Sequence, residues 1–104
     1  MTNPMQVIVY SKPECQLCEE VKADLLSIQP EFGFALFERN IEEDPELFAR
    51  FRYLIPVVDI EHHPLLYPPH TWQSVYNALR EAKQRDQEHQ MKAPTDASAQ
   101  KGSR

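Results

Sequence analysis

The sequence lacks several features that mark particular classes of protein. No apolar run approaches the ~20 residues that a membrane-spanning helix needs. Basic residues are outnumbered by acidic ones: the formal net charge is −5 and the isoelectric point is about 5.3, which argues against binding to nucleic acid or to anionic membranes. The first residues lack the basic start and the long apolar region of a secretory signal, so we expect a cytoplasmic protein.

Cysteine is scarce, and the only two cysteines lie together. Cys15 and Cys18 have the spacing C-x-x-C. In a chain without a secretory signal, such a pair is more often catalytic, redox-sensing or metal-binding than a disulfide that only stabilises the fold. The amino-acid composition is otherwise ordinary for a globular protein, with 41% hydrophobic and 26% charged residues. A length of 104 residues allows one domain with one core.

The hydrophobic period changes at the cysteines. Residues 5–10 are mostly apolar and β-branched without polar alternation, which predicts a buried strand. Beyond it, apolar residues recur at the spacing of one helical face: Leu17, Val21, Leu25 and Ile28. Pro30 predicts the end of that helix, because proline supplies no backbone N–H. Cys15 then lies near the helix start, where free N–H groups and the helix dipole are expected to lower its thiol pKa, and Cys18 is close enough to form a disulfide with it.

The remaining chain predicts further strands and helices in regular order. Strands are expected at residues 34–41, 55–60 and 65–67, a short helix after the Asp44 cap, and a last helix after the Thr71 cap. The order β-α-β-α-β-β-α predicts an α/β fold with a mixed four-stranded sheet flanked by three helices. The cysteine pair falls at the C-terminal end of a central strand, where sites of open α/β sheets lie. Five aromatic residues are assigned to core packing: Phe34, Phe37, Phe48, Phe51 and Trp72.

The composition changes near residue 83. Residues 83–104 are dominated by polar side chains and cannot bury enough apolar surface to offset the entropy of ordering them. We therefore expect a folded domain over residues 1–82, followed by a polar helix extension and a disordered C-terminal tail over residues 83–104.

Two runs of residues carry a family resemblance. The first is Tyr10-Ser11-Lys12-Pro13-x-Cys15-x-x-Cys18, and the second is Asp44-Pro45-Glu46-Leu47 followed by Ile55-Pro56-Val57-Val58. Together with the element order, they resemble the glutaredoxin-like branch of the thioredoxin fold over roughly residues 6–82. The resemblance implies that Cys15 is the nucleophile and Cys18 the resolving thiol of a dithiol centre.

The resemblance also implies a substrate surface around the dithiol. Lys12 matches the lysine that supports the thiolate and contacts a carboxylate of glutathione. Pro56 matches a cis-proline that faces the site, and the backbone of Ile55 would pair with an extended substrate. Gln16 and Leu17, between the cysteines, would complete the surface.

The chain departs from ordinary glutaredoxins at two places. The Gly-Gly turn that helps to hold glutathione is replaced by Tyr67-Pro68-Pro69-His70-Thr71, and the usual Pro-Tyr between the cysteines is replaced by Gln16-Leu17. A proline-rich backbone offers a carboxylate fewer N–H donors than a glycine turn. Whether glutathione binds is therefore left open.

These observations favour a small thiol-disulfide oxidoreductase that moves electrons through a Cys15-Cys18 dithiol. We expect a monomer without a bound cofactor, acting on a disulfide-containing protein or a low-molecular-weight thiol, with glutathione or a thioredoxin-type system as reductant. The alternative is a redox-sensing, metal-binding or iron–sulfur module on the same scaffold without turnover. Zinc held with His62, His63 or His70 is disfavoured, because adjacent histidines do not match the spacing of a zinc finger.

Overall fold

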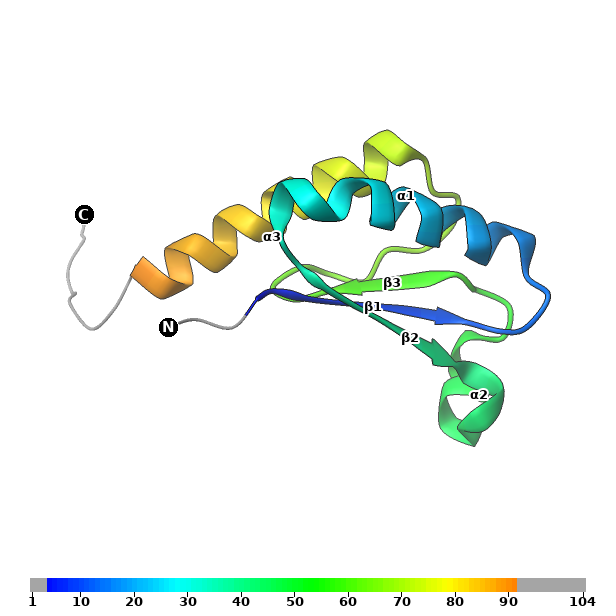
Figure 1. The fold of residues 1–104 in the computed structure, drawn as a ribbon. Helices are drawn as coiled ribbons and strands as arrows, with labels where there is room; N and C mark the ends of the chain where they lie inside the picture. Colours follow the sequence, from blue (N-terminus) through cyan, green and yellow to red (C-terminus); the bar gives the residue numbers. More distant parts are fainter. Residues whose placement is uncertain (1–3, 92–104) are drawn as a thin grey trace.

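The fold is built on a three-stranded sheet (Figure 1). The computed structural model describes residues 4–91, with side chains for residues 4–87. The strands are β1 (Gln6–Ser11), β2 (Ala35–Asn40) and β3 (Val57–Ile60), in the order β2-β1-β3. β1 pairs parallel with β2 and antiparallel with β3, so β1 is central and its C-terminal end leads directly to the cysteines. The predicted mixed α/β sheet is confirmed in these three strands.

Two long helices cover one face of this sheet. α1 (Gln16–Phe32) and α3 (Trp72–Met91) lie side by side on it, whereas α2 (Pro45–Phe51) lies beyond the C-terminal end of β2 (Figure 1). A short 3-10 helix, η1 (Ile41–Glu43), joins β2 to α2 and was not predicted. This arrangement brings the starts of α1 and β3 close together at one end of the molecule, since β1 and β3 run in opposite directions.

The main core lies between the sheet and the two long helices. Its buried side chains come from both layers: Met5, Val7, Val9, Val21, Leu25, Ile28, Phe34, Val58, Ile60, Val75, Ala78, Leu79 and Ala82. A smaller cluster of Ile41, Phe51 and Val57 attaches α2 to the sheet. Burying such aliphatic and aromatic side chains contributes roughly 1.5–3 kcal/mol each, which fixes α1 against β1 and thereby the cysteine loop.

The predicted fourth strand is wrong. In place of a strand over residues 65–67, Leu66 forms a single antiparallel bridge with Val58, through N–H···O bonds of 3.0 and 2.9 Å. Pro64 and Pro68 flank this bridge, and neither has an N–H to extend the ladder.

The prediction that the first helix stops before Pro30 is also wrong. α1 continues to Phe32 with Pro30 inside its last turn. Pro30 is exposed, and Phe32 packs on the core and against Tyr76, with ring centroids 5.3 Å apart. Tertiary packing of the last turn thus outweighs the local penalty of proline.

Other predicted boundaries and core assignments need smaller corrections. β2 is shorter than residues 34–41, and β3 begins at Val57 because Ile55 and Pro56 form a bend before it. Three of the aromatic side chains assigned to the core are exposed at their surface by a third or more: Phe37, Phe48 and Trp72. Trp72 instead reaches from α3 to α1, where its Nε1–H donates to Ser27 Oγ at 3.1 Å.

Both predicted helix caps are confirmed. Asp44 Oδ1 accepts from the N–H groups of Glu46 and Leu47 at 2.9 and 3.3 Å, and Pro45 opens α2. Thr71 Oγ1 accepts from Ser74 N–H, while Ser74 Oγ accepts from Thr71 N–H, both at 3.0 Å. These reciprocal bonds satisfy N–H groups that the first turn of α3 leaves free.

The C-terminal segment is described only in part. α3 runs past residue 82 to Met91, and Asp86 on this continuation is buried, with 7% exposure. The expected tail over residues 92–104 lies outside the described residues. Within residues 4–91, no helix is both long enough and apolar enough to cross a membrane.

Candidate redox site

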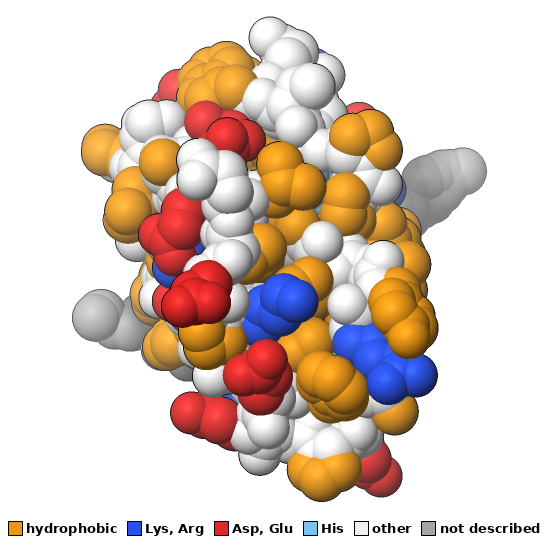
Figure 2. All heavy atoms as spheres, turned by 90° about the vertical axis from the view of Figure 1, so that its right-hand side faces the viewer, with side chains coloured by type: hydrophobic (Ala, Val, Ile, Leu, Met, Phe, Trp, Pro, Cys, Tyr) orange, Lys and Arg blue, Asp and Glu red, His pale blue; other side chains and the backbone are white. Residues whose placement is uncertain are grey.

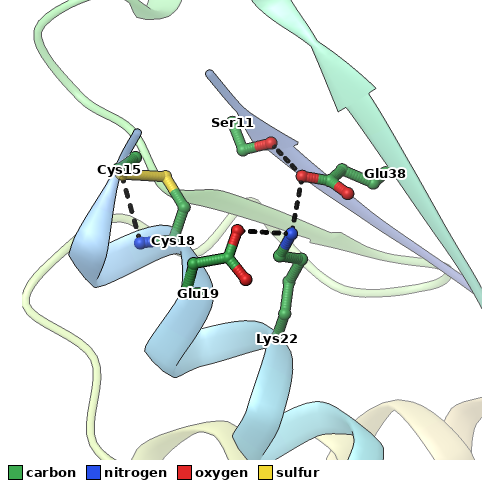
Figure 3. A network of polar contacts seen from close by, with 6 residues as sticks. All are labelled: Ser11, Cys15, Cys18, Glu19, Lys22 and Glu38. Carbon is green, nitrogen blue, oxygen red and sulfur yellow. Dashed lines mark hydrogen bonds and ion pairs between the residues drawn. A yellow bond between two sulfur atoms is a disulfide. The ribbon is translucent and has the colours of Figure 1, made fainter. Parts of the chain in front are cut away.

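Cys15 and Cys18 form a disulfide at the start of α1 (Figure 3). Their Cα atoms are 5.2 Å apart, a normal separation for bridged cysteines. Cys15 is the N-cap of α1, with extended backbone angles, and its Sγ accepts the Cys18 N–H at 3.1 Å. Cys15 is partly exposed, whereas Cys18 is fully buried. Sulfur therefore occupies the position at which an oxygen normally caps a helix.

The loop before the cysteines turns the chain from strand to helix. Glu14 adopts a left-handed backbone conformation with φ 59°, directly before the extended Cys15. The first helical bond then runs from Glu19 N–H to the Cys15 carbonyl, at 3.1 Å. The reversal sets Cys15 at the outer edge of the junction and carries Cys18 inward, towards the layer between α1 and the sheet.

A polar network follows the disulfide along α1 (Figure 3). Lys22 Nζ lies 2.9 Å from both Glu19 and Glu38, and Ser11 Oγ donates to Glu38 at 2.6 Å. The Ser11 hydrogen bond and then Lys22 lower the pKa of Glu38, and hydrogen bonds to Glu19 and Glu38 raise the pKa of Lys22. This network was not predictable from the sequence, because its residues come from three separate elements, β1, β2 and α1.

Lys12 lies in a polar hollow and makes no hydrogen bond or ion pair with any described residue. The hollow has a volume of about 370 Å³ and is lined by Ser11, Lys12, Pro13, Glu19, Glu38, Asn40 and Glu43. The role of Lys12 towards a thiolate or a carboxylate stays a prediction.

A second pocket is lined by two other residues of the predicted substrate surface, Leu17 and Pro56. The Ile55–Pro56 peptide bond is cis, as the family resemblance implies. Pro56 and Leu17 lie together in a pocket of about 340 Å³, whose lining is Leu17, Glu20, Val21, Asp24, Pro56, Pro68, Pro69 and His70. Gln16 and Ile55 do not line it; Gln16 is exposed, and Ile55 packs on the small cluster beside α2. Their roles in substrate binding stay predictions.

His70 ties the proline-rich loop to this pocket. Its Nε2 lies 2.7 Å from the Pro56 carbonyl oxygen. Because a carbonyl only accepts, Nε2 carries the hydrogen and donates it. His70 was weighed from the sequence only as a metal ligand; its contact with Pro56 joins residues fourteen positions apart and was not predicted.

Among the side chains that the structure describes, the histidines do not gather around the cysteines. His62 Nε2 lies 3.2 Å from Asp86, His63 Nε2 lies 3.2 Å from Glu81, and His70 contacts Pro56. In the part of the chain that the structure describes, no three side chains of His, Cys, Asp or Glu are placed to hold a metal ion.

Comparisons with known proteins agree with this geometry. Residues 6–90 match the family model of the Glutaredoxin-like domain (DUF836). No curated protein matches the chain significantly.

Three solved structures share the fold. A structural-genomics target protein from X. campestris has a TM-score of 0.64 at 20% identity, covering 72% of this chain and 96% of its own. Thioredoxin 1 from Thermosipho africanus TCF52B has a TM-score of 0.64 at 15% identity, and the match covers 80% of this chain and 99% of the thioredoxin chain. The protein Ne2328 from Nitrosomonas europaea has a TM-score of 0.53 at 30% identity, and the match covers 58% of this chain and 71% of the Ne2328 chain. The chain belongs to the glutaredoxin-like domain family, with a thioredoxin-like fold and a C-x-x-C pair at the start of its first helix.

Proposed function

We propose that the protein is a small thiol-disulfide oxidoreductase. The observation that carries the proposal is the unequal placement of the two sulfurs. Cys15 is accessible and caps α1, and Cys18 is buried one turn further on and bonded to it. A thiolate at the N-cap is stabilised by the first-turn N–H groups and the helix dipole. Cys15 is therefore suited to attack, and Cys18 to resolve.

The reaction transfers two electrons from the dithiol to a target disulfide. The Cys15 thiolate attacks one sulfur of the target, the target S–S bond breaks, and the leaving sulfur takes the electron pair and a proton. Cys18 then loses its proton and attacks Cys15 Sγ, so that the mixed disulfide breaks and the second target thiol leaves. The protein is left as the Cys15–Cys18 disulfide, which is the form in the structure.

Two equivalents of glutathione or one thioredoxin-type dithiol would return the protein to its reduced form. The target class is a disulfide-containing protein or a low-molecular-weight disulfide. A reducing, cytosol-like compartment suits this direction of electron flow. The protein needs no further subunit for the proposed steps, since both sulfurs belong to one chain.

The test is to replace each cysteine separately with serine. Cys15→Ser is expected to reduce the rate of disulfide reduction to the uncatalysed background, because the attacking thiolate is gone. Cys18→Ser is expected to accumulate a mixed disulfide on Cys15, visible by intact mass spectrometry. The Cys15→Ser/Cys18→Ser double variant is the control for unspecific adducts. Equal loss in both single variants without an adduct would contradict the assigned roles and favour a redox-sensing or metal-binding module.

A further inference from the structure

The pocket lined by Leu17 and Pro56 is largely apolar. Leu17 lies between the cysteines in sequence, Val21 follows one helical turn later, and Pro56, Pro68 and Pro69 complete the apolar part of the lining. Figure 2 views the end of the molecule that carries these segments: apolar side chains are spread over the middle, acidic side chains lie on the left and below, and basic side chains lie near the centre and on the right. At about 340 Å³, the pocket has room for one long side chain.

The charges that line this pocket are negative. Glu20 and Asp24 stand four residues apart on α1, a spacing that places their side chains next to each other, with Cβ atoms ~5–6 Å apart. Glu20 makes one long hydrogen bond, from Gln16 Nε2 at 3.4 Å. The Asp24 carboxylate makes no hydrogen bond or ion pair with a described residue. Within the described part of the chain, no lysine or arginine lines the pocket.

The pocket also offers few groups that could bind an anion. Three of its lining residues are prolines, which have no backbone N–H. His70 already donates its Nε2–H to the Pro56 carbonyl. A carboxylate of glutathione placed here would be repelled by two carboxylates and would find few hydrogen-bond donors. An aliphatic chain that ends in a cation would instead pack on the prolines and pair with the carboxylates.

We propose that this pocket binds an arginine or lysine side chain next to the target cysteine, so that the substrates are basic disulfide-containing peptides or proteins. The aliphatic stem packs on the prolines and Leu17, and the cationic group lies between Glu20 and Asp24. The inference rests on the proposed reductase activity and specifies its substrate class. It also accounts for the loss of the glycine turn, since a proline wall suits an aliphatic stem.

The kinetic test uses three peptide disulfides that differ only in the residue next to cysteine: arginine, glutamine or glutamate. At low ionic strength, kcat/KM for the arginine peptide is expected to exceed that for the glutamate peptide about tenfold, because two partly exposed carboxylates attract the arginine and repel the glutamate. The preference should fall with added salt, because screening weakens it. In the Glu20→Gln/Asp24→Asn variant, the preference for the arginine peptide should shrink to within about twofold.

The control variant is Glu42→Gln/Glu46→Gln, which removes the same charge from positions outside the pocket. It is expected to keep the arginine preference. Equal rates for all three peptides with the wild type, or loss of the preference in the control variant as well, would overturn the proposal while leaving the reductase activity intact.

A binding measurement separates this inference from the proposed function. The arginine peptide with serine in place of its cysteine is titrated into the oxidised protein and followed by amide NMR shifts. Shifts at Leu17, Glu20 and Asp24, absent with the glutamate peptide and in the pocket double variant, are expected even if no peptide is reduced. Absence of such shifts with the arginine peptide would count against the pocket itself.

Discussion

The two sulfur atoms show how position decides chemistry between identical side chains. Cys15 lies outside the first turn of α1 and is partly exposed; Cys18 lies inside it at 0% exposure. This difference was predictable from sequence, because the change of hydrophobic period marks where the helix begins. The surrounding side chains were not predictable in the same way. His70 and Glu38 reach their partners only through tertiary packing, and their local sequence is typical of polar loops and strand ends.

Glu38 provides a test of the network beside the disulfide. Its pKa is lowered from the ordinary value of 4.5, first by Ser11 and then by Lys22, so it stabilises the fold above about pH 4.5 and loses that contribution as pH falls through the lowered folded value. Glu38→Gln should therefore lower the free energy of unfolding at pH 7. The loss should stay below about 1 kcal/mol, because the side chain is 46% exposed.

Urea unfolding at pH 7 and below pH 4 measures this effect. The difference in unfolding free energy between wild type and Glu38→Gln should narrow at the lower pH. Glu42→Gln removes a carboxylate that forms no ion pair with a described residue, so it should show little effect at either pH. A gap that widened on acidification would show that the ion-pair network does not stabilise the folded state.

At the scale of elements, local capping signals predicted structure better than apolar runs did. Asp44-Pro45 and Thr71 start their helices as expected, because side-chain oxygens at these positions satisfy specific N–H groups. The apolar run over residues 65–67 did not form a strand, since prolines on both sides limit its ladder to one bridge. The end of α1 was misjudged at Pro30, because Phe32 gains packing that sequence alone does not reveal.

Gly33 ends α1 and gives a prediction at this scale. Its φ is 71°, in the left-handed region, and its N–H donates to the Gln29 carbonyl at 2.7 Å. A Cβ at this position would meet nothing within 4 Å, so Gly33→Ala should cost only the backbone strain, about 1 kcal/mol. For a domain of this size, this lowers Tm by roughly 4–8 °C.

Thermal unfolding of Gly33→Ala and Gly33→Asn checks the backbone explanation. Asparagine tolerates the left-handed region better than alanine, so its variant should be the more stable of the two. If asparagine were as harmful as alanine or worse, the cost would have to come from a side-chain contact at this position and not from the backbone.

At the scale of the whole molecule, the fold brings three distant segments to one end of the sheet. The cysteine loop follows β1, the Ile55–Pro56 bend precedes β3, and the proline-rich loop precedes α3. The family resemblance assigned Leu17 and Pro56 separately to a substrate surface, and the structure places both in the lining of one pocket. The acidic side of their pocket was not predicted, since Glu20 and Asp24 look like ordinary exposed positions of a helix until the loops are placed against them.

The most direct test of the account is whether Cys15 and Cys18 form a reversible redox couple in solution. The full chain is equilibrated in a graded series of glutathione redox buffers, quenched with acid, alkylated and weighed by intact mass spectrometry. The account predicts reversible conversion between the dithiol and the internal disulfide, with a midpoint inside the buffer range and little glutathionylated Cys15, because the acidic pocket repels the tripeptide. Cysteines that stay reduced in every buffer would contradict it, and a dominant glutathione adduct on the wild type would contradict the assigned pocket chemistry.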